Sequence, residues 1–199
     1  DRARDITAFD IKTTVPETAP EISKRAKAFG IATCETLQIA VSDADVVFST
    51  VTADQAIMAA RAAAPLMAQG AYFLDMNSCA PASKQVSATI MDKHNLRYVD
   101  VAVMEPVYPK QLNVPLLISG DWSDEVSTIL TNLSLTFRII DGKVGRASSI
   151  KMVRSIMVKG LEALTAECAL AAHAADVVDE VFQSLRNGHP KIDVEQRAT

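Results

Sequence analysis

The feature that most constrains the fold is an alternation of short apolar, β-branched runs with longer helical stretches between residues 6 and 140. Residues 45–51 and 72–75 are apolar enough to form buried strands, and the Ala- and Met-rich stretch 54–67 between them has a helical pattern. Strands that are joined through helices pair in parallel, so the alternation predicts an α/β fold with a doubly wound parallel sheet. The remaining strands are expected at 6–10, 32–34, 98–103, 114–118 and 136–140, and the remaining helices at 20–29, 37–42, 81–94 and 123–133.

The character of the sequence changes after Gly145. Residues 148–175 form one long helical pattern without proline, and residues 177–185 continue as a second helix. We therefore expect two domains, a sheet-containing domain at 1–146 and the start of an all-helical domain at 147–199. Because the long helix is too apolar for a lone surface element, we expect it to be buried in a homodimer.

Several polar residues lie at the predicted ends of these strands. In sheets of this type, ligands bind beyond the carboxyl ends of the strands, which makes polar side chains at that edge candidates for a binding site. The candidates are Asp10, Thr50, Val51, Thr52, Asp75, Met76, Asn77, Ser78 and Asp100.

Composition excludes several classes of function. The net charge of −4 gives no basic field for nucleic acid or an anionic membrane, and no apolar run approaches the roughly 18–20 residues of a membrane span. The three histidines and three cysteines lack metal-ligand spacing, so we expect no metal site. The odd number of widely spaced cysteines also argues against a disulfide framework, and we expect a protein of the reducing cytoplasm.

The segment richest in chemical signals runs from Gly142 to Ser155. Two glycines, Gly142 and Gly145, precede a helix whose first turn is expected to carry Lys151. Between Lys143 and Leu161 there are five basic residues and no acid. Cations near a helix N-terminus oppose the helix dipole at about 0.3–1 kcal/mol each, so this arrangement is poor for stability but suited to holding an anionic substrate.

Neighbouring positive charge and burial would also lower the pKa of Lys151 and favour its use as a base. On a helical projection one face is polar and the opposite one apolar. The polar face comprises Ser148, Lys151, Arg154, Ser155, Lys159 and Glu162, and the apolar face comprises Ile150, Val153, Met157, Leu161 and Leu164. The alternative interpretation is that the polar face is only the solvent-facing side of an amphipathic helix.

This segment resembles the catalytic-lysine motif of the β-hydroxyacid dehydrogenases and their 6-phosphogluconate dehydrogenase relatives. The motif reads Gly-x-Val-Gly-x-Gly, three residues, Lys, three residues, Asn; its matched positions here are Gly142, Val144, Gly145 and Lys151, whereas Ala147 replaces a glycine and Ser155 replaces the asparagine. The resemblance implies that Lys151 exchanges a proton with a substrate hydroxyl. The family's asparagine helps to orient the substrate, which places Ser155 at the substrate. We expect Arg154 or Lys159 to hold the carboxylate of an anionic substrate. The chain most resembles an uncharacterised branch of this family, with Arg and Ser after the lysine.

Earlier stretches resemble the same family. Residues 45–52 are similar to the strand and loop beside the cofactor, and 73–81 to the stretch that places a hydroxyl near nicotinamide. The resemblance therefore implies a Rossmann-type fold with Thr50, Val51, Thr52, Asn77 and Ser78 at the cofactor. The family's substrate loop, Ser-Gly-Gly, is replaced by a different sequence. Met104 and Glu105 would line the substrate site instead, and Pro106 has no N–H to donate there.

The glycine-rich loop that binds a dinucleotide's phosphates is not found in the sequence. This loop is expected some 20 residues before the acid that binds the cofactor ribose, and Asp10 would be that acid. We therefore expect the first strand and this loop to lie outside the chain as given. An acid at Asp10 favours NAD over NADP, although Lys12 and Thr13 lie close to it. The alternative role of Asp10 is a turn acid after a strand.

Together these features predict an NAD(P)-dependent oxidoreductase acting on the CH–OH group of a small hydroxy acid, with Lys151 as general acid/base. Two alternatives remain at this point. One is a non-catalytic protein that senses a ligand or cofactor, suggested by the altered asparagine and Ser-Gly-Gly positions. The other is an imine-reducing enzyme on the same scaffold.

Overall fold

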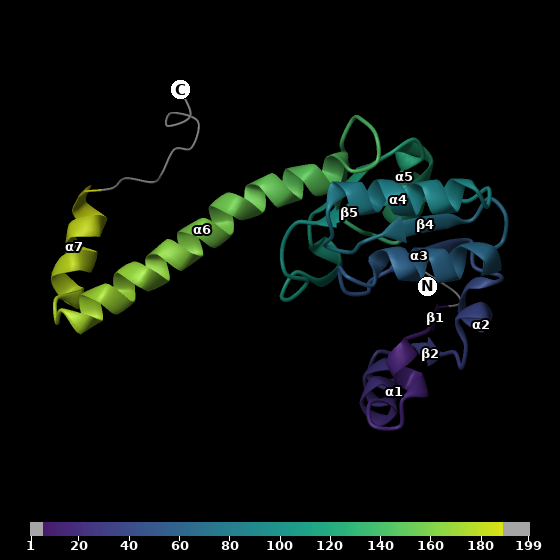
Figure 1. Ribbon diagram of the computed structural model, residues 1–199, viewed down its shortest axis with the longest axis horizontal. Coiled ribbons are helices and arrows are strands. Elements are labelled where there is room, and N and C mark those ends of the chain that lie inside the picture. Colours follow the sequence, from purple (N-terminus) through teal and green to yellow (C-terminus); the bar gives the residue numbers. More distant parts are fainter. Residues whose placement is uncertain (1–5, 189–199) are drawn as a thin grey trace. The chain divides into compact units, whose positions relative to one another are not determined.

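The computed structural model describes residues 6–188, which form two compact units: one extends to Met152 and the other begins at Val153. The first unit is built on a five-stranded sheet with strand order β3-β4-β5-β6-β7. Two of its strands, β4 and β5, are labelled in Figure 1. Its strands are β3 (Val46–Ser49), β4 (Tyr72–Asp75), β5 (Arg97–Val103), β6 (Leu116–Ser119) and β7 (Phe137–Ile139). The expected doubly wound, Rossmann-type α/β fold is confirmed.

The last two strands, β6 and β7, correct the expectation of an all-parallel sheet. β3, β4 and β5 pair in parallel, as do β6 and β7, but β5 and β6 are antiparallel. Parallel pairing needs a crossover connection, usually a helix. The segment between β5 and β6 holds only a three-residue 3-10 helix, η3 (Gln111–Asn113), and Met104 N–H donates to Pro115 O at 2.9 Å, so the chain turns straight back.

Helices cover both faces of this sheet. On one face Phe73 and Tyr98 pack with buried residues of α3 (Ala56–Ala63) and α4 (Pro81–Asp92). On the other, Leu74 and Val99 pack with α5 (Ser123–Asn132). Adjacent residues of a strand point to opposite faces, which explains why β4 and β5 contribute to both clusters and are buried almost throughout.

The first residues form a separate, smaller layer. β1 (Thr7–Ala8) pairs in parallel with β2 (Ala32–Thr33), and η1 (Ile11–Thr14) and α1 (Ala19–Ala28) connect the two strands. α2 (Leu37–Val41) follows and is capped by the Thr36 hydroxyl, while η2 (Ala64–Leu66) extends α3. Among the described residues no strand joins this pair to the main sheet, so the chain shows two sheets where one was expected.

Two helices follow the sheet, as the sequence predicts: α6 (Arg146–Ala174) and α7 (Val178–Gly188). α6 begins in the first unit, where Ala147 is fully buried and Ile150 packs against its cluster. The domain limits at 146 and 147 stay a prediction. Within residues 6–188, none of the helices is both long and apolar enough to cross a membrane.

Candidate active site at the carboxyl ends of the strands

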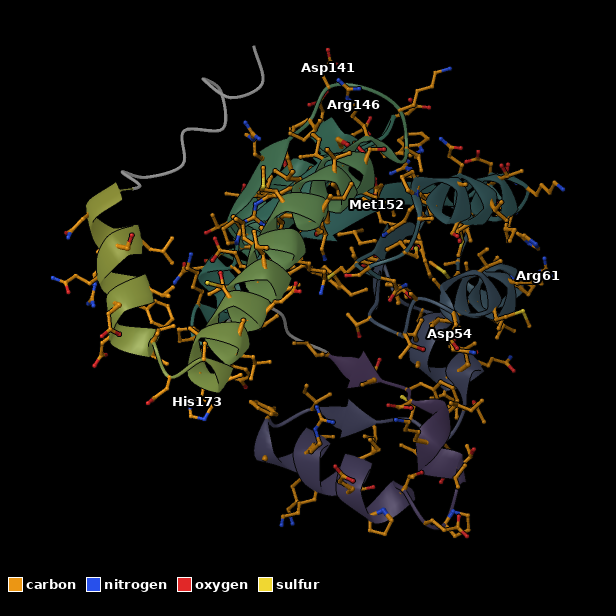
Figure 2. The ribbon with its side chains drawn as sticks, turned by 60° about the vertical axis from the view of Figure 1, so that its left-hand side comes forward. Asp54, Arg61, Asp141, Arg146, Met152 and His173 are labelled. Atoms are coloured by element: carbon orange, nitrogen blue, oxygen red, sulfur yellow. The ribbon has the colours of Figure 1, made fainter. Side chains whose placement is uncertain are left out.

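The structure brings together two of the residues singled out from sequence, Lys151 and Ser78. Ser78 lies in the loop after β4, and Lys151 lies in the second turn of α6, whose start is marked by Arg146 and Met152 in Figure 2. Lys151 Nζ donates a hydrogen bond to Ser78 Oγ at 2.6 Å. An amine and a hydroxyl that lie 73 positions apart in the chain thus meet at the carboxyl edge of the sheet.

The environment of Lys151 favours its neutral form. Burial lowers the pKa of this amine below its ordinary value of 10.5, and the positive charge of Lys84 lowers it further. A lysine with a lowered pKa exchanges protons more readily near neutral pH than an exposed one. The two causes expected from sequence, burial and neighbouring charge, therefore both act here, although the charge comes from Lys84 on α4.

Behind Lys151 lies a buried group of three charges, Asp75, Lys84 and Asp100, none of which has solvent-exposed surface. Lys84 Nζ contacts Asp75 Oδ1 at 2.9 Å and Asp100 Oδ1 at 3.5 Å, and it also donates to the Asp75 carbonyl at 2.6 Å. Tyr98 donates its hydroxyl to Asp75 Oδ2 at 2.7 Å. Burial and the Asp75 charge raise the pKa of Tyr98, so this hydroxyl keeps its proton and remains a donor.

Asp100 caps the first turn of α6. Its Oδ2 accepts hydrogen bonds from the N–H groups of Gly145 and Ser148 at 3.1 and 3.0 Å, and its Oδ1 accepts the Ser148 hydroxyl at 2.6 Å. One expectation changes as a result: Ser148, assigned to the polar face, is buried with 5% exposure. The anion that the structure shows at this helix N-terminus is the Asp100 carboxylate.

The loop that carries Ser78 is held by its own polar groups. Asp75 Oδ1 accepts the N–H of Asn77 at 3.0 Å, and the Asn77 side-chain amide donates to Ser49 Oγ at 2.9 Å. The Asn77 Oδ1 atom is buried and accepts no hydrogen bond from the part of the chain that the structure describes. A buried acceptor of this kind can be satisfied by a bound polar molecule.

The other predicted cofactor residues are exposed. Thr50, Val51 and Thr52 form the loop directly after β3, at the same edge of the sheet as Ser78. Asp10 follows β1 and caps η1, accepting the N–H of Lys12 at 2.9 Å through Oδ1. This is the turn role kept open for Asp10, and its cofactor role stays a prediction.

The predicted substrate residues fall into two groups. Met104 packs beside the buried cluster that contains Ala147, and Glu105 forms an ion pair with Lys110. Arg154, Ser155 and Lys159 continue α6 beyond Lys151 and belong to the second unit. Their contacts with substrate stay predictions.

Sequence reasoning missed Lys84, which looks like an ordinary polar residue of a surface helix. A signal was present nonetheless. Asp75 ends one strand and Asp100 interrupts the next, and both strands are apolar enough to be buried. Two carboxylates buried on neighbouring strands require a counter-ion. A lysine one turn into the following helix is placed to provide it.

Two other features of the described residues bear on the chemistry. Between residues 6 and 188 no group of three His, Cys, Asp or Glu side chains is placed to hold a metal ion. A surface hollow near the start of β5, at the edge of the sheet opposite Ser78, is lined by Gln69, Gly70, Asp92, Asn95, Leu96, Arg97 and Trp122. It is separate from the Lys151 site.

Comparison with known proteins gives one family match. The sequence model described as the NAD binding domain of 6-phosphogluconate dehydrogenase matches residues 3–107, more than half of the 199-residue chain.

Similar solved structures include a conserved hypothetical protein from Sinorhizobium meliloti 1021, which is 31% identical with a TM-score of 0.75 over 99% of this chain and 65% of that one. The Mycobacterium tuberculosis 3-hydroxyisobutyrate dehydrogenase with L-serine is 17% identical, with a TM-score of 0.74 over 94% of this chain and 63% of the enzyme. A variant imine reductase from Myxococcus stipitatus in complex with NAD+ is 20% identical, with a TM-score of 0.71 over 96% and 64%. The latter two show a shared fold, and the chain spans slightly under two thirds of the length of all three.

Proposed function

The chain belongs to the family of the NAD binding domain of 6-phosphogluconate dehydrogenase, and we propose that it is the greater part of an NAD(P)-dependent oxidoreductase acting on a small hydroxy acid. In this proposal, hydride passes between nicotinamide and the carbon that bears the substrate hydroxyl, and Lys151 is the general acid/base.

The observation that carries the proposal is the contact between Lys151 Nζ and Ser78 Oγ at 2.6 Å. An amine with a lowered pKa faces the loop at the carboxyl ends of β3 and β4, where doubly wound sheets bind their ligands. A general acid/base must lie within hydrogen-bond reach of a substrate hydroxyl, and a substrate oxygen beside Ser78 Oγ would satisfy that requirement.

The residues at this edge fit a nicotinamide dinucleotide. Ser78 and the two threonines at 50 and 52 are exposed. The buried Asn77 Oδ1 has no donor among the described residues, and a carboxamide could supply one. Asp10 would accept hydrogen bonds from the adenosine ribose, which favours NAD over NADP. When bound, the cofactor supplies or accepts the hydride.

The chain's own groups would perform the remaining steps. In the oxidation direction, neutral Lys151 takes the proton of the substrate hydroxyl onto Nζ, and in reduction it returns that proton to the carbonyl oxygen. The Ser78 hydroxyl accepts a hydrogen bond from the amine and so orients it. Arg154 and Lys159 would hold the substrate carboxylate, with Ser155, Met104 and Glu105 around the remainder of the substrate.

The direct test is the substitution Lys151→Met, with Lys143→Met as the matched control on an exposed lysine outside the site. Turnover with a panel of small 2- and 3-hydroxy acids, followed by NADH or NADPH formation, should fall about 10²–10⁴-fold for the first and stay unchanged for the second. Cofactor binding, measured by calorimetry, should persist in both. Survival of turnover in Lys151→Met would contradict the proposal.

The similarity to an imine reductase supports imine reduction as a second candidate function. An imine-reducing enzyme on this scaffold would be active with cyclic imines or amines and inactive with the whole hydroxy acid panel. A third outcome, cofactor binding without hydride transfer to any of these substrates, would indicate a sensor protein.

We also propose a homodimer that buries α6. Four of its apolar residues, Val153, Ile156, Leu164 and Leu170, are each more than 60% exposed within the chain, an unusual arrangement for a monomer. Size-exclusion chromatography at micromolar concentration should show the dimer mass. Since all three cysteines are free thiols, we propose the cytoplasm as the compartment.

A further inference from the structure

Lys151 and Ser78 come from two separate segments of the chain. One buried side chain, Lys84, contacts the carboxylates that hold these two segments. Ser78 belongs to the loop after β4, which is fixed by Asp75 through its bond to the Asn77 N–H. Lys151 belongs to the start of α6, which is fixed by Asp100 through its bonds to Gly145 and Ser148. Lys84 lies between the two carboxylates and contacts both.

We propose that Lys84 is the positioning residue of this site, holding the Ser78 loop through Asp75 and the first turn of α6 through Asp100 so that Lys151 meets Ser78. Its functional meaning rests on the proposed role of Lys151, but its position and charge can be tested without a substrate.

The chemistry of the group supports a positioning role over a merely stabilising one. Replacing a buried ion pair by apolar side chains often stabilises a protein, so stability alone gives little reason to bury three charges with no exposed surface. The charged side chains instead fix the orientation of the groups to which they bond. Lys84 donates to the Asp75 carbonyl as well as to its carboxylate. Asp100 accepts three hydrogen bonds from Gly145 and Ser148 at the start of α6, so each partner is fixed by more than one bond.

The group also sets the electrostatic field at the site. It carries one positive and two negative charges, and Lys84 is the member whose charge acts on Lys151. Replacing Lys84 removes the positive charge that lowers the pKa of Lys151 and should make Lys151 easier to protonate. Removing the Asp100 charge leaves Lys84 less compensated and should make Lys151 harder to protonate. If Lys84 acts as proposed, the two substitutions therefore shift the pKa of Lys151 in opposite directions.

The experiment measures the titration midpoint of Lys151 by competitive acetylation of lysines across pH, with mass spectrometry of the Lys151 peptide, in the full chain and two variants. Lys84→Met should raise the midpoint by about 0.5–1 pH unit, and the near-isosteric Asp100→Asn should lower it by a smaller amount. The control Asp92→Asn removes a carboxylate at the far end of α4, about 12 Å along the helix from Lys84, and should leave the midpoint unchanged.

Structural loosening gives a different result. If Lys84 only stabilises the fold, both site variants expose Lys151, and both midpoints rise toward 10.5. That outcome, or two unchanged midpoints, would overturn the inference. Because Lys84→Met can fail to fold, slow labelling of the buried Cys79 thiol serves as its folding check, and Asp100→Asn decides the question alone if that check fails. Opposite shifts in a protein without dehydrogenase activity would support the positioning role and reject the proposed function.

Discussion

The Tyr98 hydroxyl offers a quantitative test of the buried charge group. Its bond to Asp75 Oδ2 is 2.7 Å long, Tyr98 is 2% exposed, and Asp75 has no exposed surface. The substitution Tyr98→Phe removes this donor and leaves the ring stacked on Phe73, so it creates no large cavity. A hydrogen bond to a charged group contributes about 1.5–3 kcal/mol, and the buried oxygen that loses its donor has no water to replace it. We expect the free energy of unfolding to fall by about 2 kcal/mol.

Tyr72→Phe is the matched control on the adjacent strand. The Tyr72 hydroxyl accepts from Arg97 at 2.7 Å in a partly exposed position, and the Arg97 guanidinium also lies over the Tyr72 and Trp122 rings. Solvent can replace that bond, so the expected cost is about 0.5–1 kcal/mol.

The assay is urea unfolding followed by the fluorescence of Trp122, the only tryptophan of the chain, which reports the first unit. With a slope of about 2 kcal/mol per molar urea, the midpoint should fall by about 1 M for Tyr98→Phe at unchanged slope. Equal, small losses in the two variants would refute the reasoning, because they would mean that the Asp75 carboxylate does not depend on the Tyr98 donor.

Three further outcomes follow from the geometry. Gly145→Ala should destabilise the fold by about 1–3 kcal/mol, because φ is +98° and a Cβ would lie 3.2 Å from Pro81 Cβ. Gly160→Ala should stabilise it by about 0.5–1 kcal/mol, because a Cβ at this position in α6 meets no atom within 4 Å. Thermal unfolding distinguishes the two variants. Burial raises the pKa of Cys79, so a thiol reagent at mildly alkaline pH should modify the other two thiols first, and equal rates would contradict its burial. Because the base form of Lys151 is needed for oxidation and its pKa is lowered, kcat/KM for oxidation should rise with pH and level off below 10.5; a rise that continues past 10.5 would argue against Lys151 as the base.

The elements of the fold were largely predictable because local patterns determine them. The strand at 72–75 is found at the predicted residues, since its apolar run is bounded by Gly70 and by the polar loop after Asp75. The direction of β6 was not predictable from its own residues, because it depends on whether the chain before it crosses the sheet. Strands β1 and β2 keep only two residues each, since their pairing depends on neighbours and not on local composition.

The site was predictable where chemistry is concentrated in sequence and not where it depends on burial. Lys151 and Ser78 were identified from their motifs, and the structure brings the two side chains into contact. Ser148 was assigned to the exposed face because a helical projection contains no information on a capping carboxylate 48 positions away. Lys84 was missed for the same reason, because it lies on α4 and its two partners come from strands β4 and β5.

The separation between buried and exposed groups has a consequence for protein engineering. The side chains that fix Lys151 lie inside the molecule, whereas Thr50, Thr52 and Ser78 are exposed and Glu105 is partly so. Exposed substitutions usually change stability by no more than about 0.5 kcal/mol. A library that varies exposed or partly exposed positions such as Glu105, and keeps Ser78 as the hydrogen-bond partner of Lys151, can therefore sample new substrate ranges while the amine stays in place. Changes at 75, 84 or 100 would instead displace the Ser78 loop or the start of α6, and selections should leave those codons untouched.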